Sequence, residues 1–373
     1  MKIAHLTSVH AWGDTRIFVK MCQSIACHGH EAILVAPRKR SEPRREVRNG
    51  VTVLAVTQYR NRFARSTLCV AELLFKALRA NADLYHLHDP ELVWVGCLLK
   101  LARKKVLFDF HEDFTSQTQR KEWIPACLKP LVFQLASMIE KVAALSSDGI
   151  IAATPPIAEK FNGRRVETIN NFALLSEFEL APNDSGNEKL NAVVYIGGIT
   201  EDRGLEDIIT AMGMVSYRPR PKLLLGGRFE SETFKHKLMA MPEWQYVDFH
   251  GYCTRENVSR LLTMSRAGLV VLRSIPRYVE SQPVKLFEYM AAALPVIASD
   301  FPPWKPFVEP HDCGLLVSPQ KPQAIAAAVD WIFSNPDRAN EMGLRGRNAV
   351  REKYNWSHEF AKLLSFYEET LRS

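Results

Sequence analysis

Residues 277–300 are RYVESQPVKLFEYMAAALPVIASD, and this stretch predicts one helix followed by one strand of an α/β protein. Pro283 suits the first turn of a helix, because its fixed φ angle and missing N–H cost nothing there. Apolar residues then recur at helical spacing, and they are Val284, Leu286, Phe287, Met290, Ala291 and Leu294. Pro295 ends the predicted helix, and the Val-Ile-Ala-Ser after it predicts a short buried strand. We therefore expect Glu280 in the loop before the helix and Glu288 in its second turn.

This arrangement suits a ligand that carries an anion and several hydroxyl groups. The free N–H groups and the positive dipole end of a helix attract anions. Glu280 and Glu288 can accept hydrogen bonds from paired hydroxyls, as on a ribose or a sugar ring, and Lys285 adds a cation beside them. The alternative is an amphipathic helix with two solvated acids, which the spacing of the two glutamates alone would favour.

Length and composition indicate a globular protein of two domains. The 373 residues exceed the size at which a single hydrophobic core stops growing. A content of 47% hydrophobic and 24% charged residues is typical of a globular protein, and no long uncharged apolar run suggests a membrane span. Met1 leads directly into a predicted strand, so no signal peptide is expected. Seven scattered cysteines without metal-binding spacing predict free thiols in a reducing cytoplasm.

The net charge of +7 lies entirely in the first half of the chain. Residues 1–180 hold 25 Lys and Arg against 18 Asp and Glu, whereas the remainder holds 23 of each. Much of the excess lies in Arg38-Lys39-Arg40, Arg44-Arg45, Arg48 and the run 60–65. A basic half can meet nucleic acid, an anionic membrane or a phosphorylated acceptor. A solvated loop without a partner explains the same charges equally well.

Short β-branched runs alternate with helical patterns, which predicts parallel, doubly wound sheets. In the first half we expect strands at 2–6, 31–36, 51–56, 84–88, 105–110, 149–153 and 166–169, and helices at 16–28, 66–80, 90–103, 125–145 and 155–161. Polar, turn-rich residues at 181–187 predict a linker. In the second half we expect further strands at 192–196, 222–225, 247–250, 268–272 and 315–317, and helices at 204–214, 232–241, 254–266, 322–334, 336–353 and 356–371. The sequence thus predicts an α/β fold of two Rossmann-like halves with a catalytic cleft between them.

The string VKLFEYMAAALPVIASD at 284–300, preceded by Glu280, resembles the nucleotide-sugar-dependent retaining glycosyltransferases of family 4. The resemblance spans nearly the whole chain, but its specific motifs lie in 193–205 and 279–300. It implies the GT-B fold, in which two Rossmann-like domains with parallel sheets face each other across a cleft. The implied parts are an acceptor-binding domain at 1–185, a nucleotide-sugar-binding domain at 186–353 and a helix at 354–373 that returns to the first domain.

The resemblance also implies roles for the residues of this stretch. Glu288 would bind the ribose of the nucleotide, and Glu280 would lie against the donor sugar. The loop residues that would contact sugar hydroxyls are Ser281, Gln282, Pro283 and Val284. The family works without a metal ion, so neither a metal nor a cofactor is expected, and the nucleotide-diphosphate sugar is a co-substrate.

Residues 193–205, VVYIGGITEDRGL, predict a strand, a glycine turn and a helix, which is the geometry that cradles a phosphate. The family has a basic pair here that neutralises the donor diphosphate, and Arg203 matches its second position. Gly198 occupies the first position, which is a departure from the family pattern. Charge compensation would then depend on Arg203, on Lys285 and on Arg228, which follows a similar glycine turn.

Polar residues also gather after strands of the first half, where parallel sheets bind ligands. Gly13 stands where the family has a glycine pair near the donor phosphate, and it permits close backbone approach. His111 matches a family histidine beside the transferred sugar, and two acids follow it. Asp14 and Arg16 fit either substrate contact or capping and pairing on the first helix, and capping is favoured for Asp14.

Two further features of the first half have two interpretations each. His86 and His88 suggest a metal site, but no third ligand is evident and no metal is expected. Asp89-Pro90 fits a helix start better. The apolar stretch 123–133 fits a membrane interface, although a buried helix is favoured.

These residues predict a glycosyltransferase that moves a sugar from a UDP- or GDP-type donor to a hydroxyl acceptor with retention of configuration. His111, Glu280, Arg203 and Lys285 would be catalytic, by contacting the sugar and offsetting the charge of the departing diphosphate. The basic first half indicates a glycan or polyprenyl-diphosphate-linked acceptor, as in bacterial surface polysaccharide synthesis. The expected location is the cytoplasm, with peripheral contact to the inner face of the plasma membrane.

Two other functions fit the same fold or site. A nucleotide-sugar 2-epimerase would consume the donor without an acceptor. A non-catalytic nucleotide-sugar or nucleic-acid-binding protein would explain Gly198 and the single Gly13, but the complete set of Glu280, Lys285 and Glu288 argues against it. A basic helix and stacking aromatics, which mark specific nucleic-acid readers, are not evident, so no nucleic-acid partner is expected.

Overall fold

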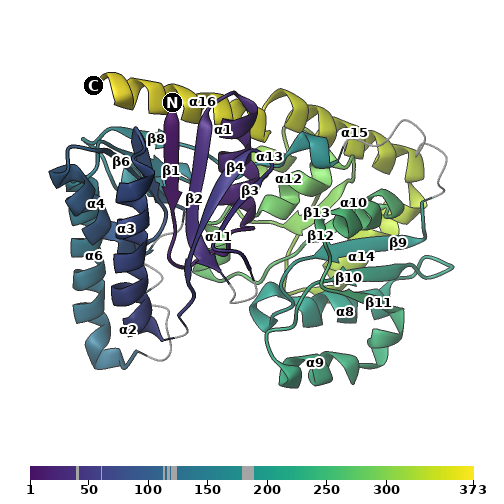
Figure 1. Ribbon diagram of the computed structural model, residues 1–373. Coiled ribbons are helices and arrows are strands. Elements are labelled where there is room, and N and C mark those ends of the chain that lie inside the picture. Colours follow the sequence, from purple (N-terminus) through teal and green to yellow (C-terminus); the bar gives the residue numbers. More distant parts are fainter. Residues whose placement is uncertain (39–41, 60, 112–113, 116–117, 119–123, 179–188) are drawn as a thin grey trace. The chain divides into compact units, whose positions relative to one another are not determined.

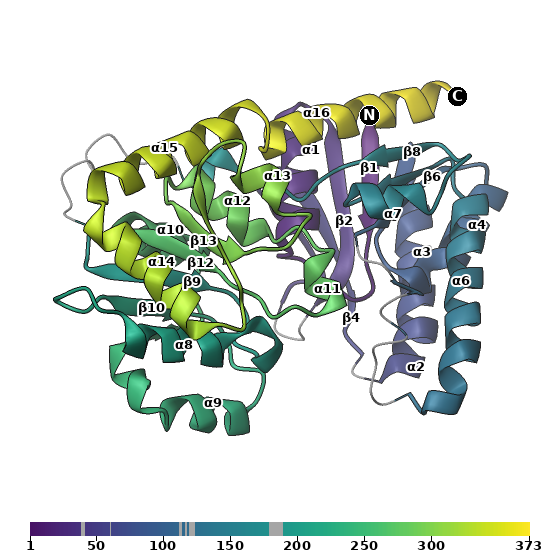
Figure 2. The same ribbon diagram turned by 180° about the vertical axis from the view of Figure 1, so that it is seen from behind.

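The computed structural model describes residues 1–38, 42–59, 61–111, 114–115, 118, 124–178 and 189–373 (Figures 1 and 2). It divides into two compact units: unit 1 holds Met1–Asn171 with Ser357–Ser373, and unit 2 holds Phe172–Trp356. The sequence placed these divisions at 185/186 and 353/354. The predicted linker at 181–187 lies outside the described residues, as do Lys39, Arg40, Arg60, Glu112, Asp113, Lys121 and Trp123.

Unit 1 is built on one eight-stranded sheet in the order β3-β4-β2-β1-β5-β6-β7-β8. The strands are β1 (Lys2–Leu6), β2 (Glu31–Arg38), β3 (Arg45–Arg48), β4 (Val51–Thr57), β5 (Leu84–Leu87), β6 (Lys105–Phe110), β7 (Gly149–Ala152) and β8 (Val166–Thr168). All pairs are parallel except β3 with β4. The sequence assigned the basic residues of β3 to a loop, but they form an antiparallel edge strand. Charge suits that position because it discourages further strand pairing.

Helices cover the sheet of unit 1, and alternate side chains of each strand pack against them. They are η1 (Thr15–Cys22), α1 (Gln23–Cys27), α2 (Arg62–Ala64), η2 (Arg65–Cys69), α3 (Val70–Ala80), η3 (Pro90–Leu92), α4 (Val93–Leu101), η4 (Ala126–Leu128), α6 (Lys129–Leu145), α7 (Pro155–Glu159) and most of α16 (Trp356–Arg372). Ala4 and Leu6 enter the core formed with α3, α4 and α6. Because neighbouring residues of a strand face opposite sides, His5 lies on the other face, near Tyr367 of α16.

The C-terminal helix α16 packs tightly on this second face of the unit 1 sheet. Glu359 accepts the backbone N–H of Asn170 at 2.6 Å, and the Tyr367 hydroxyl lies 2.8 Å from Nδ1 of His86. A methyl group on Gly149 of β7 would lie 2.7 Å from the ring of Phe366. The residues of α16 from 357 onward therefore complete unit 1 although they follow unit 2 in the chain.

Unit 2 is a six-stranded, fully parallel sheet in the order β11-β10-β9-β12-β13-β14. The strands are β9 (Ala192–Ile196), β10 (Lys222–Gly226), β11 (Val247–Gly251), β12 (Ala267–Val270), β13 (Val296–Ser299) and β14 (Gly314–Val317). The helices are η5 (Leu175–Glu177), η7 (Glu201–Arg203), α8 (Leu205–Met214), α9 (Glu232–Met239), η8 (Pro242–Tyr246), α10 (Arg255–Met264), α11 (Pro276–Val279), α12 (Val284–Ala291), α13 (Lys305–Val308), α14 (Pro322–Ser334) and α15 (Pro336–Glu352). Val194 packs in one core with α10, α12 and α15, and Val193 packs in a second core with α8 and α14. Helices on both faces confirm the predicted α/β class.

Two helices that the sequence did not predict are very short. The four-residue helices α11 and α13 are too short to show a helical period. The longest described helices, α6, α15 and α16, have 17 residues each. No helix in the described part of the chain combines the length and the apolar character that crossing a membrane requires.

Helix α12 begins after Pro283 and ends at Ala291, three residues earlier than predicted. The helix ends there because Ala293 takes a left-handed φ of 55°. The residue before Pro295 is also disfavoured in the helical conformation, so the last predicted turn cannot form. Glu288 lies in the second turn, as predicted.

Tyr289 fastens α12 to the sheet of unit 2. Its buried hydroxyl accepts the backbone N–H of Ile196 at 2.9 Å. A methyl group on Gly268 of β12 would lie only 2.2 Å from the Tyr289 ring. The glycine therefore allows the close approach that sets the position of α12.

We predict that Gly268→Ala lowers the free energy of unfolding by about 1–3 kcal/mol, because the added methyl group overpacks the buried Tyr289 ring. Urea denaturation followed by circular dichroism measures the change. Gly213→Ala in α8 is the matched control, because there the nearest atom, 2.4 Å away, is Cγ of the flexible Glu243 side chain. Equal stability of the two variants would contradict the role assigned to Gly268.

Candidate active site

Two glycine turns meet at the carboxyl ends of β9 and β10. Gly197 follows β9 and donates its N–H to the carbonyl oxygen of Gly226 at 2.9 Å. Gly227 follows β10 with a φ of 156°, and a methyl group on it would lie 1.8 Å from the carbonyl oxygen of Gly197. Only glycine fits such an approach, so the two turns form a compact backbone platform at the edge where parallel sheets bind ligands.

Two cations converge on this platform. A methyl group on Gly197 would lie 3.1 Å from Nη1 of Arg203 and 3.2 Å from Nζ of Lys285. A methyl group on Gly198 would also lie 3.2 Å from Nη1 of Arg203. Lys285 Nζ lies 3.7 Å from the centre of the Tyr195 ring, which supports a cation from below. The structure thus brings Gly198, Arg203 and Lys285 together, although Gly198 and Lys285 lie 87 positions apart in the sequence.

The amine of Lys285 makes no hydrogen bond to the described residues. Although part of its side chain is accessible, Nζ is buried and its described contact is the Tyr195 ring. Burial and the neighbouring Arg203 lower the pKa of Lys285 well below its usual value, although Glu288 acts in the opposite direction. A buried amine beside a guanidinium, with no carboxylate in ion-pair contact with either among the described residues, is suited to an anionic ligand.

Glu288 is nearly buried and is held by Arg255 of α10. Its Oε1 lies 2.8 Å from Nη2 of Arg255, and the same guanidinium nitrogen contacts Glu177 of η5. A charge-assisted bond of this kind fixes the orientation of the carboxylate. A carboxylate has more acceptor capacity than one arginine uses, so Glu288 can still accept hydrogen bonds from hydroxyls.

The loop between α11 and α12 contains the other predicted sugar contacts. Glu280 is exposed at the end of α11. Ser281 donates its hydroxyl to the carbonyl oxygen of Tyr278 at 3.0 Å, and its own carbonyl oxygen accepts Nε1–H of Trp304 at 2.6 Å. Gln282 Oε1 is buried and has no hydrogen-bond partner among the described residues. The loop is therefore held in place while one of its polar atoms stays available.

Unit 1 has its own polar edge after β6. The His111 ring lies 5.0 Å from the His10 ring, edge to face, and its Nδ1 is buried without a partner in the described part of the chain. Burial lowers the pKa of His111, so its imidazole is neutral near neutral pH. Although burial opposes a charge on His10, Asp14 at 3.4 Å and Asp89 at 3.5 Å raise its pKa. A neutral and a readily protonated imidazole thus lie side by side.

The residues around Gly13 are structural. Asp14 caps η1, because its Oδ1 accepts the N–H groups of Arg16 and Ile17 at 2.9 Å each, as the sequence favoured. Arg16 forms a bidentate ion pair with the buried Asp109, with N–O distances of 3.0 and 2.9 Å. A methyl group on the exposed Gly13 would meet nothing within 4 Å, so a ligand can approach its backbone.

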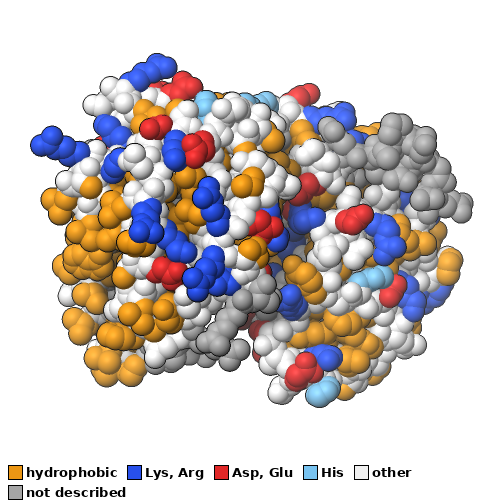
Figure 3. All heavy atoms as spheres, viewed as in Figure 1, with side chains coloured by type: hydrophobic (Ala, Val, Ile, Leu, Met, Phe, Trp, Pro, Cys, Tyr) orange, Lys and Arg blue, Asp and Glu red, His pale blue; other side chains and the backbone are white. Residues whose placement is uncertain are grey.

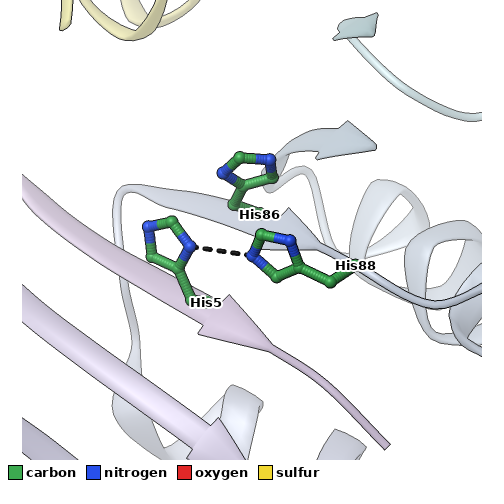
Figure 4. A group of neighbouring side chains, drawn as sticks. All are labelled: His5, His86 and His88. Carbon is green, nitrogen blue, oxygen red and sulfur yellow. Dashed lines mark hydrogen bonds between the residues drawn. The ribbon is translucent and has the colours of Figure 1, made fainter. Parts of the chain in front are cut away.

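The structure supplies the third histidine that the sequence did not reveal. His5 of β1 lies beside His86 and His88, and all three present ring nitrogens within 4.8 Å of one another (Figure 4). His5 Nδ1 lies 2.9 Å from His88 Nε2, and His88 Nδ1 lies 3.0 Å from Asp109 Oδ2. Burial lowers the pKa of His5 and His86 well below its usual value. We assign these neutral imidazoles to a hydrogen-bonded network between the sheet and α16.

The helix start predicted at Pro90 is confirmed, but Asp89 does not cap it. The carboxylate of Asp89 instead accepts the Thr7 hydroxyl and the Ser8 N–H at 2.7 Å each. Asp89 therefore ties the loop after β1 to the start of η3.

Sequence reasoning missed Arg255 and Thr200, and it placed His10 in a polar cluster after the first strand without assigning it a role. The start of α10 was predicted at 254, but nothing in the sequence shows that its first residue reaches Glu288. Thr200 follows the glycine turn, and its hydroxyl is buried without a hydrogen-bond partner among the described residues. All predicted donor residues from 198 to 288 belong to unit 2, whereas Gly13 and His111 belong to unit 1. The roles assigned to them stay predictions.

Both halves of the chain match known glycosyltransferase families. Residues 13–170 match the family described as glycosyl transferase 4-like domain. Residues 177–349 match the family described as glycosyl transferases group 1. Together the two matches take in most of the chain.

Several relatives carry glycosyltransferase names. A phosphatidyl-myo-inositol mannosyltransferase of Mycobacterium leprae is 24% identical over 305 residues, which are 78% of this chain and 74% of that protein. The D-rhamnosyltransferase WbpZ of Pseudomonas aeruginosa is 22% identical over 75% of this chain and 72% of its own. An uncharacterized glycosyltransferase of Methanocaldococcus jannaschii is 25% identical, and this chain spans about half its length, 54%.

Solved structures share the fold. A sucrose-phosphate synthase from Thermosynechococcus elongatus superposes with a TM-score of 0.78 at 20% identity, covering 99% of this chain and 98% of that one. HepE of Anabaena, solved in complex with UDP-glucose, gives a TM-score of 0.73 at 15% identity, covering 99% of this chain and 100% of that one. These similarities confirm the predicted GT-B fold.

We predict that a nucleoside diphosphate binds with uptake of a proton. The anion raises the pKa of Lys285, which burial and Arg203 lower in the free protein. Affinity should therefore be highest below the pKa of the free amine and fall as the pH rises through it. Titration calorimetry of UDP and GDP in buffers with different ionisation enthalpies measures the uptake.

Lys285→Met should abolish this proton uptake and weaken binding roughly 10–100-fold, as loss of a charged hydrogen bond of about 1.5–3 kcal/mol implies. Lys235→Met, at a lysine on α9 that pairs with Glu232, is the matched control and should bind normally. Unchanged proton uptake in Lys285→Met would assign the effect to another group.

Proposed function

The chain belongs to the glycosyltransferases of the 4-like and group 1 families, and we propose that it transfers a sugar from a nucleotide-diphosphate donor to a hydroxyl group with retention of configuration. Family membership confirms the resemblance that residues 280–300 indicated. The donor, the acceptor and the stereochemistry belong to the proposal. The observation that carries it is the convergence of Arg203 and Lys285 on the glycine turn of unit 2.

A departing nucleoside diphosphate needs cations where its charge develops. Arg203 and Lys285 lie beside Gly197, and neither has a carboxylate partner within the described residues. Such preorganised charges in a water-poor site stabilise a leaving group more than they would in water. The family has a basic residue at the position of Gly198, and Lys285 would supply that charge here. Arg228 is directed elsewhere, because its guanidinium stacks over Tyr252 at 4.1 Å.

The rest of the donor would lie along α12 and the loop before it. Glu288, oriented by Arg255, would accept the ribose hydroxyls. Gln282, with its unpaired buried carbonyl oxygen, would accept a sugar hydroxyl. Glu280 and Ser281 would contact the sugar from the loop before α12. These contacts fit a ligand with a diphosphate between two hydroxyl-rich rings.

The reaction would keep the acceptor and the leaving group on one face of the sugar. The bond from the anomeric carbon to the diphosphate oxygen breaks, and the acceptor oxygen bonds to the same carbon. The acceptor proton passes to the departing phosphate oxygen, so the protein needs no strong base. His111, neutral and with a free ring nitrogen, would orient the sugar or the acceptor hydroxyl.

We propose a lipid-linked or glycan acceptor, as in bacterial surface polysaccharide synthesis. The relative named as a phosphatidyl-myo-inositol mannosyltransferase supports a lipid-linked acceptor, because its name contains a lipid. UDP is the first donor nucleotide to test, because the solved relative HepE carries UDP-glucose. The seven free cysteines support a reducing cytoplasm, and the basic first half supports peripheral contact with the inner face of the plasma membrane.

We predict that nucleotide release from one of a panel of UDP-, GDP- and ADP-sugars requires a polyprenyl-diphosphate-linked acceptor. Glu288→Ala should lower kcat/KM roughly tenfold or more, because charge-assisted bonds to the ribose are lost. Glu341→Ala, at an exposed glutamate of α15, is the control and should keep the activity. Coupled assay of nucleotide release measures both variants.

Three other outcomes would replace the proposal. Donor consumption without an acceptor and without nucleotide release indicates a 2-epimerase. Donor binding without turnover indicates a binding protein. Full activity of Glu288→Ala removes the ribose site assigned to α12.

We also predict that the product keeps the anomeric configuration of the donor, because the acceptor attacks the face that the diphosphate leaves. Proton NMR of the anomeric coupling in the product, recorded before mutarotation, measures this. An inverted product would require a protein base and would contradict the proposed proton path.

A further inference from the structure

One side of unit 1 exposes an unusual amount of apolar surface. Of the 21 large hydrophobic side chains that are exposed among the described residues, 13 lie between Phe63 and Leu145. They come from the helical segments α2 to α4 and η4 to α6. Figure 3 shows hydrophobic side chains gathered over the same region of unit 1, where Figure 1 draws α3, α4 and α6. Concentration on one side marks an interaction surface, because scattered apolar residues are the normal pattern.

Helix α6 has its large apolar residues on the wrong side for a core helix. Its buried positions are Ala136, Glu140, Ala143 and Ala144. Its exposed positions include Leu131, Leu135, Met138 and Leu145, which follow one another at helical spacing. Leu131 is 62% exposed and Met138 56%. The sequence favoured a buried helix for 123–133. In the described part of that stretch only Ile124 is buried, whereas Leu128, Leu131 and Phe133 are exposed, so most of the stretch contradicts the expectation.

Helices α4 and α3 extend the same surface. Trp94, Leu98 and Leu101 form one outward stripe on α4, with Trp94 70% and Leu101 80% exposed. Phe75 and Leu78 form the outward stripe on α3. We call the three stripes together the apolar face of unit 1.

The charges around the apolar face are positive. Arg79, Arg103 and Lys141 are exposed on or next to these helices. The acids of α3 and α6 are less exposed. Glu140 is buried and accepts the N–H of Thr115 at 3.1 Å, whereas Glu72 keeps 31% of its side chain exposed, accepts the N–H of Thr57 at 2.9 Å and pairs with Lys76. The face therefore combines aromatic and aliphatic side chains with exposed cations, the composition of helices that lie in a membrane interface.

We propose that the apolar face of α3, α4 and α6 is the surface by which unit 1 binds an anionic lipid bilayer. A second copy of the chain is the other occupant to consider. In a two-fold dimer the same patch meets itself, so its cations would face one another. An anionic bilayer instead receives the apolar side chains and pairs with the cations at once. The proposal extends the proposed function, in which the acceptor is lipid-linked, but its test needs no catalysis.

The basic residues of β3 are a competing contact that the sequence singled out. They lie at the edge of the sheet, five positions from β6, on which α4 packs, whereas α3 contacts β4, the neighbour of β3. Arg48 of β3 stacks over Trp12 at 4.0 Å and bonds Glu46. Separate variants can therefore distinguish the helical face from the basic edge strand.

The test is co-sedimentation with vesicles of phosphatidylcholine mixed with phosphatidylglycerol, compared with vesicles of phosphatidylcholine alone. The full chain should bind the anionic vesicles, and salt should weaken the binding. The triple variant Leu98→Gln, Leu101→Gln, Met138→Gln should lower the partition coefficient on the order of tenfold or more, because three inserting side chains are lost. Glutamine keeps the helix propensity and no core residue changes, so the variant should fold.

Two matched variants complete the experiment. Met214→Gln, Met239→Gln, Leu344→Gln changes three exposed apolar residues of unit 2 and should bind like the unchanged protein. Arg44→Gln, Arg45→Gln neutralises the basic edge and should keep most binding.

Four results would overturn the proposal. The first is no vesicle binding by the full chain, and the second is full binding by the triple variant. The third is loss of binding in the Arg44 and Arg45 variant alone. The fourth is a dimer of the full chain in sedimentation velocity that becomes a monomer in the triple variant, with no vesicle binding by either protein. The triple variant should also keep turnover of a water-soluble acceptor analogue. If transfer fails in every variant while vesicle binding behaves as expected, the proposed reaction falls and the membrane surface stands.

Discussion

The close contact between two glycine turns is the constraint on which the donor site depends. Gly227 approaches the carbonyl oxygen of Gly197 so closely that a single methyl group would separate β9 from β10 at their carboxyl ends. Because no side chain projects from these glycines, Arg203 and Lys285 can reach the backbone of Gly197 from two different elements. A side chain on Gly197 would fill the space beside both cations, where we propose that a diphosphate binds. The close backbone contact is therefore a requirement for the two basic side chains to form this site.

Some of the buried polar atoms without hydrogen-bond partners among the described residues lie where chemistry is proposed, and others, such as Nε2 of His5 and of His86, do not. Lys285 Nζ, Gln282 Oε1 and Thr200 Oγ1 of unit 2 and His111 Nδ1 of unit 1 are all buried without hydrogen-bond partners among the described residues. Buried polar groups usually find partners, so each unpaired atom has a cost that a ligand can offset. The Arg16–Asp109 pair shows the opposite case, because its bidentate contacts satisfy both groups and make the pair structural. The unpaired groups of unit 2 therefore support the proposed donor site, whereas the Arg16–Asp109 pair belongs to the scaffold.

Much of the fold could be predicted, and the misses have physical reasons. Strands and long helices have periodic apolar patterns, so β9 was found at its observed bounds and only the end of α12 was placed three residues too late. Strand β3 was missed because its charged residues show no apolar alternation, and its antiparallel partner β4 is what makes it a strand. For α6 the helix was predicted correctly, but the burial favoured for 123–133 was wrong for most of the described part of that stretch. Apolar periodicity shows that a helix has an apolar face, but it does not say whether protein or another phase covers that face.

The sequence by itself determined the order of strands and helices and the local placement of Glu280, Lys285 and Glu288, because these depend on neighbours within a few residues. Only the tertiary structure decided which distant groups meet them. Arg255 reaches Glu288 because β11 and α10 lead to that end of the sheet, and His5 joins His86 because β1 pairs with β5. Such contacts depend on strand order, register and the alternation of side chains across a sheet. Those quantities arise from pairing between segments far apart in the chain, which no single stretch of sequence encodes.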